Sequence, residues 1–277
     1  MRIFIITMED PLYTLPMIKT ITEARGQDIV GIALAKGNRL TIGQNRSKAA
    51  YVISLFFIMG LYPFLRNSAI TLAYKAKKYF ATRTSLVRMP GLAKCAEERG
   101  IPLYRISSPN SRDFLALLRS LDLDVIINQS QSILKKELLQ IPRMGVINRH
   151  NALLPKNRGR LTPFWVLYKN EKETGVSIHF VNEGIDAGPI IVQERYPVLP
   201  GDNFHSLVEK NYKLAPRAML KALDKLERGE KDYLDNCDAS ATYNPVPTLK
   251  NALEYRWARV KRGFQKAAKN PHRQELK

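Results

Sequence analysis

Three residues of this sequence combine types and spacing that suit catalysis: Asn148, His150 and Asp186. Asn148 and His150 lie where an apolar run ends in GVINRHNALLP, and Asp186 follows in GIDAGPI. The amide donates a hydrogen bond, the imidazole donates a proton or a hydrogen bond near neutral pH, and the carboxylate orients the imidazole or accepts a proton. These groups suit acyl transfer, because they can stabilise the oxyanion that forms when an amine adds to a carbonyl. Structural roles at a strand end and in a turn remain the alternative.

Several common motifs are absent from the sequence. It contains no Gly-x-Gly-x-x-Gly, no Gly-x-x-x-x-Gly-Lys-Ser/Thr, no His-Glu-x-x-His and no Gly-x-Ser-x-Gly. These absences argue against a glycine loop for dinucleotides or nucleoside triphosphates and against a nucleophile elbow. Two cysteines without a Cys-x-x-Cys pair predict no metal site and favour a reducing, cytoplasmic location.

Strand-like and helical segments alternate around these residues. We expect strands over 2–6, 28–34, 103–106, 124–128 and 145–148, and helices over 12–24, 90–99, 113–121, 134–139 and 162–170. Two more strands over 175–181 and 189–196 and a long helix over 204–226 follow. The alternation predicts an α/β fold with a Rossmann-like, mostly parallel sheet and helices on both faces. Asn148 and His150 then lie at the carboxyl edge, where such sheets bind ligands.

The positive charge is concentrated in two segments. The net charge is +19, yet residues 29–96 contain eleven Lys and Arg and no acidic residue, and residues 250–277 contain nine basic and two acidic residues. Such segments suit an anionic partner, which could be a membrane surface, a nucleic acid or a phosphorylated substrate. Charge that serves only solubility is the alternative.

An uncharged stretch of 17 residues, 49–65, lies inside the first basic segment. It is short for a membrane-spanning helix, and Gly60 and Pro63 interrupt it. We expect an apolar helical insertion over 35–88. Its residues 49–80 either pack against the core or a second subunit, as in a homodimer, or touch the inner face of a membrane peripherally. The predicted organisation is a catalytic domain over 1–228 and a basic extension over 229–277, helical over 249–268 and loose beyond.

The region from Asp124 to Gln193 contains several short motifs in a fixed order. Their residues are Asn148, His150, Leu153, Leu154, Pro155, Arg158, Gly159, Gly175, Ser177, His179, Asp186, Gly188 and Ile190. They match Asn-x-His-x-x-Leu-Leu-Pro, then Arg-Gly, Gly-x-Thr/Ser-x-His and Asp-x-Gly-x-Ile. In this pattern the chain resembles the folate-dependent formyltransferases, which act on glycinamide ribonucleotide, methionyl-tRNA or aminosugars.

The resemblance implies an enzyme that moves a formyl group from 10-formyltetrahydrofolate to an amine. Asn148 and His150 would stabilise the oxyanion, and Asp186 would orient His150 and assist proton removal. The donor would bind along two loops, at Ser132, Ile133, Leu134, Glu183, Gly184 and Ile185. The acceptor would bind near Asn151, Arg158 and Gly159. His179 is expected to be structural or to support the trio.

Departures from the family pattern concern the acceptor. Asn151 and Ala152 stand where Pro-Ser is usual, and Asn157 replaces an aromatic residue. The helical C-terminal pattern argues against a methionyl-tRNA enzyme with its barrel domain, so no nucleic-acid partner is expected, and the apolar insertion argues against a glycinamide ribonucleotide enzyme. The favoured acceptor is an aminosugar, either nucleotide-linked or lipid-linked. The two disfavoured transferases, a formyltetrahydrofolate hydrolase and a non-enzymatic membrane or nucleic-acid binder remain alternatives.

Overall fold

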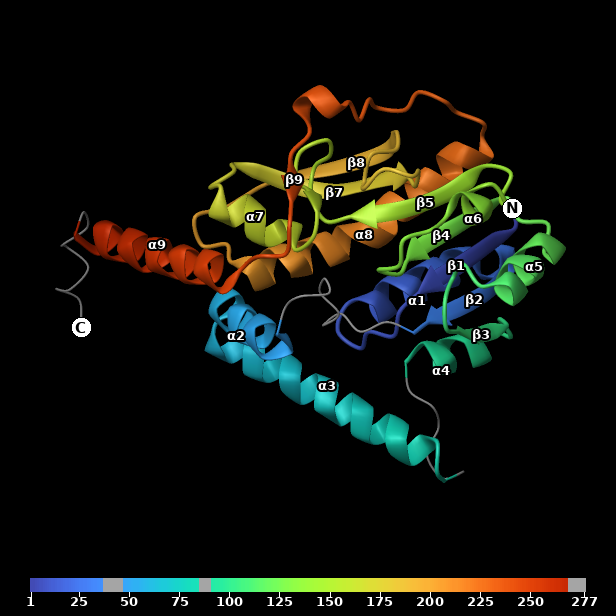
Figure 1. The fold of residues 1–277 in the computed structure, drawn as a ribbon, viewed down its shortest axis with the longest axis horizontal. Helices are drawn as coiled ribbons and strands as arrows, with labels where there is room; N and C mark the ends of the chain where they lie inside the picture. The colour runs from blue at the N-terminus through green and yellow to red at the C-terminus, as the bar shows by residue number, and fades with distance from the viewer. Residues whose placement is uncertain (37–46, 85–90, 269–277) are drawn as a thin grey trace.

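A seven-stranded sheet organises the computed structural model, which describes residues 1–36, 47–84 and 91–268 (Figure 1). Its strands are β1 (Ile3–Thr7), β2 (Ile29–Ala35), β3 (Leu103–Ile106), β4 (Val125–Gln129), β5 (Gly145–His150), β7 (Glu173–Phe180) and β8 (Ile190–Pro197). They follow the order β3-β2-β1-β4-β5-β7-β8. The first five are parallel, and β7 is antiparallel to both of its neighbours. The predicted mostly parallel α/β sheet is therefore confirmed.

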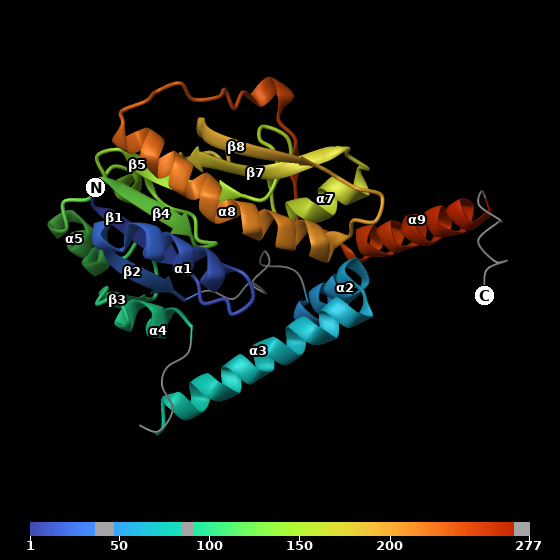
Figure 2. The same ribbon diagram turned by 180° about the vertical axis from the view of Figure 1, so that it is seen from behind.

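Helices cover both faces of this sheet (Figures 1 and 2). On one face lie α1 (Thr14–Arg25), α4 (Leu92–Glu97) and α8 (Phe204–Glu227), and on the other lie α5 (Arg112–Ser120) and α6 (Lys136–Leu139). The longer helices turn periodic apolar stripes toward the strands, as Met17, Ile18 and Ile21 of α1 do with fully buried side chains. Burial of one such side chain contributes about 1.5–3 kcal/mol to folding. The sheet is thus a rigid base for groups at its edges.

The insertion forms a pair of helices beside this body. They are α2 (Lys48–Met59) and α3 (Leu61–Ala81), joined at Gly60, whose φ of 85° is unfavourable for other residues. Ile58 of α2 joins a third apolar cluster with α7 (Thr162–Tyr168) and α9 (Leu249–Ala268). Within the described ranges, no helix combines the length and apolarity needed to cross a bilayer. Insertion residues 37–46 and 85–88 lie outside the described part of the chain.

The chain after α8 returns to the body. A bridge joins Leu234 to Ile190, and a second small sheet pairs β9 (Tyr243–Asn244) with β6 (Arg158–Gly159). Two short 3-10 turns, Gly26–Asp28 and Asp238–Ser240, complete the regular elements. A domain boundary at residue 228 remains a prediction, and the tail after Ala268, expected to be loose, lies outside the described residues.

Candidate active site

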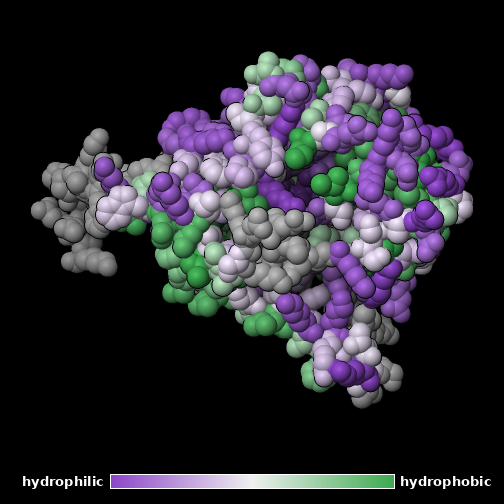
Figure 3. Space-filling view, in the orientation of Figure 1, coloured by the Kyte–Doolittle hydropathy of each residue, from purple (hydrophilic) through white to green (hydrophobic). Residues whose placement is uncertain are grey.

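The predicted trio meets at the carboxyl end of β5. Asn148 pairs with Asn128 of β4 on one side and with His179 of β7 on the other. Asp186 follows β7 in the loop that leads to β8. Figure 3 shows the surface hollowed, with polar atoms on its floor, where Figure 1 places the arrowhead of β5. The topology therefore brings residues 36 positions apart to one accessible edge.

His150 is held between a carbonyl and a carboxylate. Its side chain is only 6% exposed, and Nε2 lies 2.8 Å from the Asn157 carbonyl oxygen. A carbonyl only accepts hydrogen bonds, so this nitrogen carries a hydrogen. The other ring nitrogen, Nδ1, lies 3.4 Å from Asp186 Oδ2. The Asp186 carboxylate thus lies where it can stabilise a positive charge on His150.

Asp186 is fixed by its backbone and by its neighbours. It adopts a left-handed conformation with φ of 50°, and its carbonyl accepts a 2.9 Å hydrogen bond from Asn236 Nδ2. The backbone N–H of Gly159 donates to its Oδ2 at 2.9 Å. Burial alone would raise the pKa of Asp186, but His150, His179 and the Gly159 N–H outweigh burial and hold the pKa below its usual value. Asp186 is therefore an anion at neutral pH.

His179 lies on the other side of the same carboxylate. Nε2 is 3.6 Å from Asp186 Oδ1, and Nδ1 donates to the Phe180 carbonyl at 2.7 Å. Burial lowers the pKa of His179 to about 4 although Asp186 favours its charged form. The ring is consequently neutral at pH 7, and the two groups do not form an ion pair. Its T-shaped contact with His150 supports the packing of the trio.

A chain of hydrogen bonds orients the Asn148 amide. Gln129 Nε2 donates to Asn148 Oδ1 at 3.1 Å, and Gln129 Oε1 accepts from Arg149 Nε at 3.0 Å. Arg149 is itself fixed, because its guanidinium donates to Tyr212 Oη at 3.0 Å and lies over that ring. With its oxygen engaged, the amide directs its NH₂ group away from Gln129 as a donor.

Asn157 is the centre of a buried polar cluster below His150. Its Nδ2 donates to Glu171 at 2.9 Å, and its Oδ1 accepts from Asn244 Nδ2 at 2.7 Å and from Lys169 Nζ at 3.3 Å. Burial lowers the pKa of Lys169 despite the nearby carboxylate of Glu171. The asparagine that replaces the usual aromatic residue therefore links His150 to β9.

The loops predicted to bind the donor flank this edge. Ile133 and Ile185 are 83% and 55% exposed, whereas Leu134 is buried in the core. Ser132 is half-buried, and Glu183 and Gly184 are exposed. Two exposed apolar side chains, one on each loop, fit a flat heteroaromatic ligand such as a pterin, because the ligand would remove both from water. Their role in donor binding remains a prediction.

The residues predicted near the acceptor are already engaged with protein groups. Arg158 is buried, and its guanidinium contacts Asp238 Oδ1 at 2.5 Å and the Asn236 carbonyl at 2.7 Å. Gly159 has φ of 106°, and a Cβ there would lie 2.2 Å from the Asn244 carbonyl. The Asn151 side chain accepts a hydrogen bond from Arg149. A direct contact of these residues with an acceptor stays a prediction.

Sequence reasoning did not find four supporting residues: Gln129, Arg149, Asn157 and Asn236. The sequence position of Gln129 could have indicated its role. It is the last residue of β4, and Asn148 lies near the end of the adjacent strand β5, so the two side chains meet at the same edge. Asn157 was noticed only as a departure from the family pattern. The contact of Asn236 depends on the return of the chain after α8, which no periodicity in the sequence indicates.

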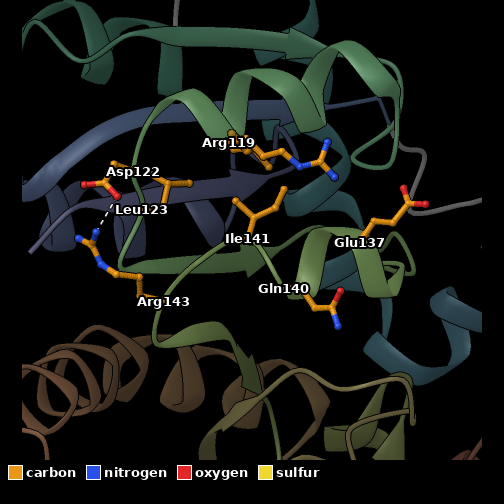
Figure 4. Close-up of a pocket in the computed structure, with 8 residues that line it drawn as sticks. Arg119, Asp122, Leu123, Glu137, Gln140, Ile141 and Arg143 are labelled. Atoms are coloured by element: carbon orange, nitrogen blue, oxygen red, sulfur yellow. Dashed lines mark hydrogen bonds and ion pairs between the residues drawn. The ribbon is translucent and has the colours of Figure 1, made fainter.

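A different pocket lies at the opposite edge of the sheet. Figure 4 shows Leu123 and Arg143, which precede β4 and β5, among its lining residues, and Arg143 pairs with Asp122 at 2.6 Å. It is far in the topology from the carboxyl ends that hold the trio, so we do not assign it to the same site. Among the described residues, no group of three or more His, Cys, Asp or Glu side chains is placed to hold a metal ion.

Comparison with known proteins identifies the family. The model of the formyl transferase family matches residues 67–223, more than half of the chain. The chain belongs to the formyl transferase family. Methionyl-tRNA formyltransferase of Kosmotoga olearia is 34% identical over 172 residues, which cover 62% of this chain and 55% of that protein. The chain spans about half the length of the curated relatives it matches.

Solved structures of formyltransferases have the same fold. Phosphoribosylglycinamide formyltransferase from Streptococcus pneumoniae has a TM-score of 0.55 at 15% identity, and the match covers 82% of this chain and 98% of that one. The N-formyltransferase from Helicobacter canadensis, solved with folinic acid and dTDP-3-aminofucose, has a TM-score of 0.54 at 15% identity and covers 88% and 70%. Identities this low establish the shared fold alone.

Proposed function

We propose that this protein is an N-formyltransferase that moves the formyl group of 10-formyltetrahydrofolate to an amine. The single observation that carries the proposal is the arrangement of Asn148, His150 and Asp186 at the carboxyl edge of β5 in a formyl transferase family member. Such an edge is where open α/β sheets bind their ligands. The relatives named above support the reaction class, although they are only partly covered by this chain.

The reaction follows from the geometry. The acceptor nitrogen adds to the formyl carbon and gives a tetrahedral oxyanion. When this intermediate collapses, the C–N bond to the folate breaks, and the folate nitrogen takes up the proton that the acceptor nitrogen has released to Asp186, directly or through a water. The Asn148 NH₂ group donates to the carbonyl oxygen as it gains negative charge, since Gln129 occupies the amide oxygen. His150 adds a second favourable charge or hydrogen bond, stabilised by Asp186 at 3.4 Å. The Asp186 carboxylate accepts the proton that the acceptor nitrogen releases, directly or through a water.

Supporting roles go to the groups that hold this carboxylate. The Gly159 N–H donates to Asp186 Oδ2. Arg158 donates to the Asn236 carbonyl, and the Asn236 side chain in turn donates to the backbone carbonyl of Asp186. The proposed donor loops are 132–134 and 183–185, where exposed Ile133 and Ile185 would cover the pterin.

For the acceptor, we propose an aminosugar. The Helicobacter canadensis neighbour was solved with dTDP-3-aminofucose, which supports a nucleotide-linked aminosugar, whereas the apolar insertion of this chain favours a lipid-linked one. Methionyl-tRNA is the second candidate, because relatives that carry this name share 34% identity and the chain has a net charge of +19.

A panel assay tests the reaction and separates the acceptors. The protein is incubated with 10-formyltetrahydrofolate and, in turn, nucleotide aminosugars, glycinamide ribonucleotide and methionyl-tRNA, and tetrahydrofolate formation is followed. Product that depends on an aminosugar supports the proposal. Product with methionyl-tRNA alone replaces the acceptor, formate release without any amine indicates a hydrolase, and no folate product in any arm contradicts formyl transfer.

A further inference from the structure

The outer face of α3 is apolar and exposed along the length of the helix. Its exposed apolar residues recur every three or four positions, at Leu61, Leu65, Ala69, Leu72, Ala76 and Phe80. At about 100° per residue, this spacing forms one stripe along the helix. Leu72 is 66% exposed, so the stripe is open at this position among the described residues.

The opposite face of α3 is fixed to the body. Asn67 donates to the Tyr13 hydroxyl at 3.2 Å, and Tyr74 and Lys78 both bind the Glu9 carboxylate. These three residues lie within an arc of about 40° on the helix, diametrically opposed to the stripe. The helix is therefore held so that its apolar side points away from the protein.

Basic side chains border the stripe on both sides. On the same helical wheel, Arg66 and Lys77 lie along one margin and Lys75 along the other, and all three are exposed. Neither α2 nor α3 contains an acidic residue. Apolar groups between two basic margins are typical of helices that lie in the plane of an anionic bilayer, where the lysine stems extend toward the headgroups.

A second helix repeats this arrangement. On α9, Ala252 and Tyr255 are buried, whereas Leu249, Leu253, Trp257 and Val260 form an exposed stripe on the far side, and Trp257 is 72% exposed. Lys250 and Lys261 lie along one margin, where Lys250 pairs with Glu254, and Arg256 lies along the other. Figures 1 and 2 show α9, α2 and α3 along one margin of the molecule, and Figure 3 shows apolar atoms gathered over α2 and the start of α3.

We propose that this margin docks on an anionic lipid surface, with the stripes of α3 and α9 at the headgroup boundary. Charge complementarity selects the lipid over a second copy of the chain. A two-fold dimer through α3 would bring its basic margins together, because the helix offers no acidic group to pair with them. This surface binding is independent of the proposed formyl transfer.

Sedimentation with vesicles tests the docking. Wild-type protein is mixed with vesicles of phosphatidylcholine alone or with an equal part of phosphatidylglycerol. We expect sedimentation with the anionic vesicles only, weakened by salt. The double variant Leu65→Glu/Leu72→Glu should bind about tenfold more weakly or worse. A matched variant with the same charge change on other exposed apolar residues, Met144→Glu/Leu234→Glu, should bind within about twofold of wild type.

A second pair of variants tests the basic margins. Replacement of Arg66, Lys75 and Lys77 by Gln should reduce binding about tenfold or more, whereas replacement of Lys172, Lys213 and Arg217 by Gln, which removes equal charge elsewhere, should have a smaller effect. Circular dichroism verifies that each variant is folded. The proposal is overturned if the wild type does not bind vesicles, or if Leu65→Glu/Leu72→Glu and Met144→Glu/Leu234→Glu bind equally well. It is also overturned if the wild type binds no lipid and is a dimer that Leu65→Glu/Leu72→Glu converts to monomers.

Discussion

The edge around β5 and the α2–α3 insertion use side chains in opposite ways. At the edge, polar groups are buried and held by specific partners, as His150 is by Asn157 and Asp186. On α3, apolar groups such as Leu72 are exposed between basic ones. Buried polar groups demand partners at fixed positions, whereas an apolar stripe needs only helical spacing. The first arrangement suits chemistry at one atom, and the second suits a surface without fixed geometry.

The largest expected effect is on turnover, and it should arise at the β5 edge and not on α3. Asn148→Ala removes the proposed oxyanion donor and should reduce kcat about a hundredfold or more, as the loss of one such donor does. Leu72→Glu, a change confined to the stripe, should leave turnover on a soluble acceptor within about twofold. Steady-state kinetics with the acceptor from the panel assay provide both values. Near-normal turnover of Asn148→Ala would exclude the mechanism.

The buried histidine predicts a pH-dependent stability that no group of the α3 stripe shares. The folded pKa of His179 is about 4 against an ordinary 6.5, so the unfolded chain binds more protons between these values. This contribution to stability is present above pH 6.5 and is lost as the pH falls toward 4. Urea unfolding of wild type should lose about 2 kcal/mol more than His179→Asn between pH 7 and 5. Equal losses in the two proteins would contradict a buried neutral imidazole.

A subtler effect should follow from the group that orients Asn148. Gln129→Glu replaces the NH₂ donor by a carboxylate beside Asn148 Oδ1, which favours a flipped Asn148 amide. We expect kcat to fall about tenfold, the value of roughly one hydrogen bond, with the acceptor KM nearly unchanged. Gln193→Glu, on the more distant β8, is the comparison variant. An equal fall in both variants would assign the effect of Gln129 to charge alone.

The smallest effect concerns the point where the two regions touch. Glu9→Gln weakens the hydrogen bonds to Tyr74 and Lys78 that fix α3 to the loop after β1. The free energy of global unfolding should change by about 1 kcal/mol or less, because both partners are partly exposed. Hydrogen exchange of α3 should nevertheless accelerate several-fold relative to α8. Unchanged exchange would show that packing, not Glu9, holds the helix.

The sequence was sufficient to predict the sheet and the place of Asn148 and His150 at its carboxyl edge. Apolar runs such as 3–7 and 125–128 alternate with helical spacing, and this pattern alone determines the α/β class. The motif around Asn148 and His150 was visible because its residues lie close together in the sequence, within 148–155. The partner Asn157 was not predictable, because its backbone carbonyl reaches His150 through a contact that depends on tertiary placement.

Helix boundaries show the same limit on a smaller scale. A helix was expected over 134–139, but α6 covers only Lys136–Leu139, because Leu134 turns into the core beside β4 instead. The long helix over 204–226 was predicted within one residue, since its apolar stripe continues for six turns and Asn203 caps its start. Strong periodicity therefore determines an element, and tertiary contacts determine its ends.

The return of the chain after α8 has a consequence for the timing of synthesis. All seven strands of the main sheet are complete by residue 197. The hydrogen bond to the Asp186 carbonyl comes from Asn236, and the one to the Asn157 side chain comes from Asn244, so both depend on residues that are synthesised later. A nascent chain can thus fold its sheet while its reaction centre is still unassembled. The contacts of Asn236 and Asn244 form only after these residues have been synthesised, so the supports of the Asp186 backbone and of Asn157 are added to a sheet that is already complete.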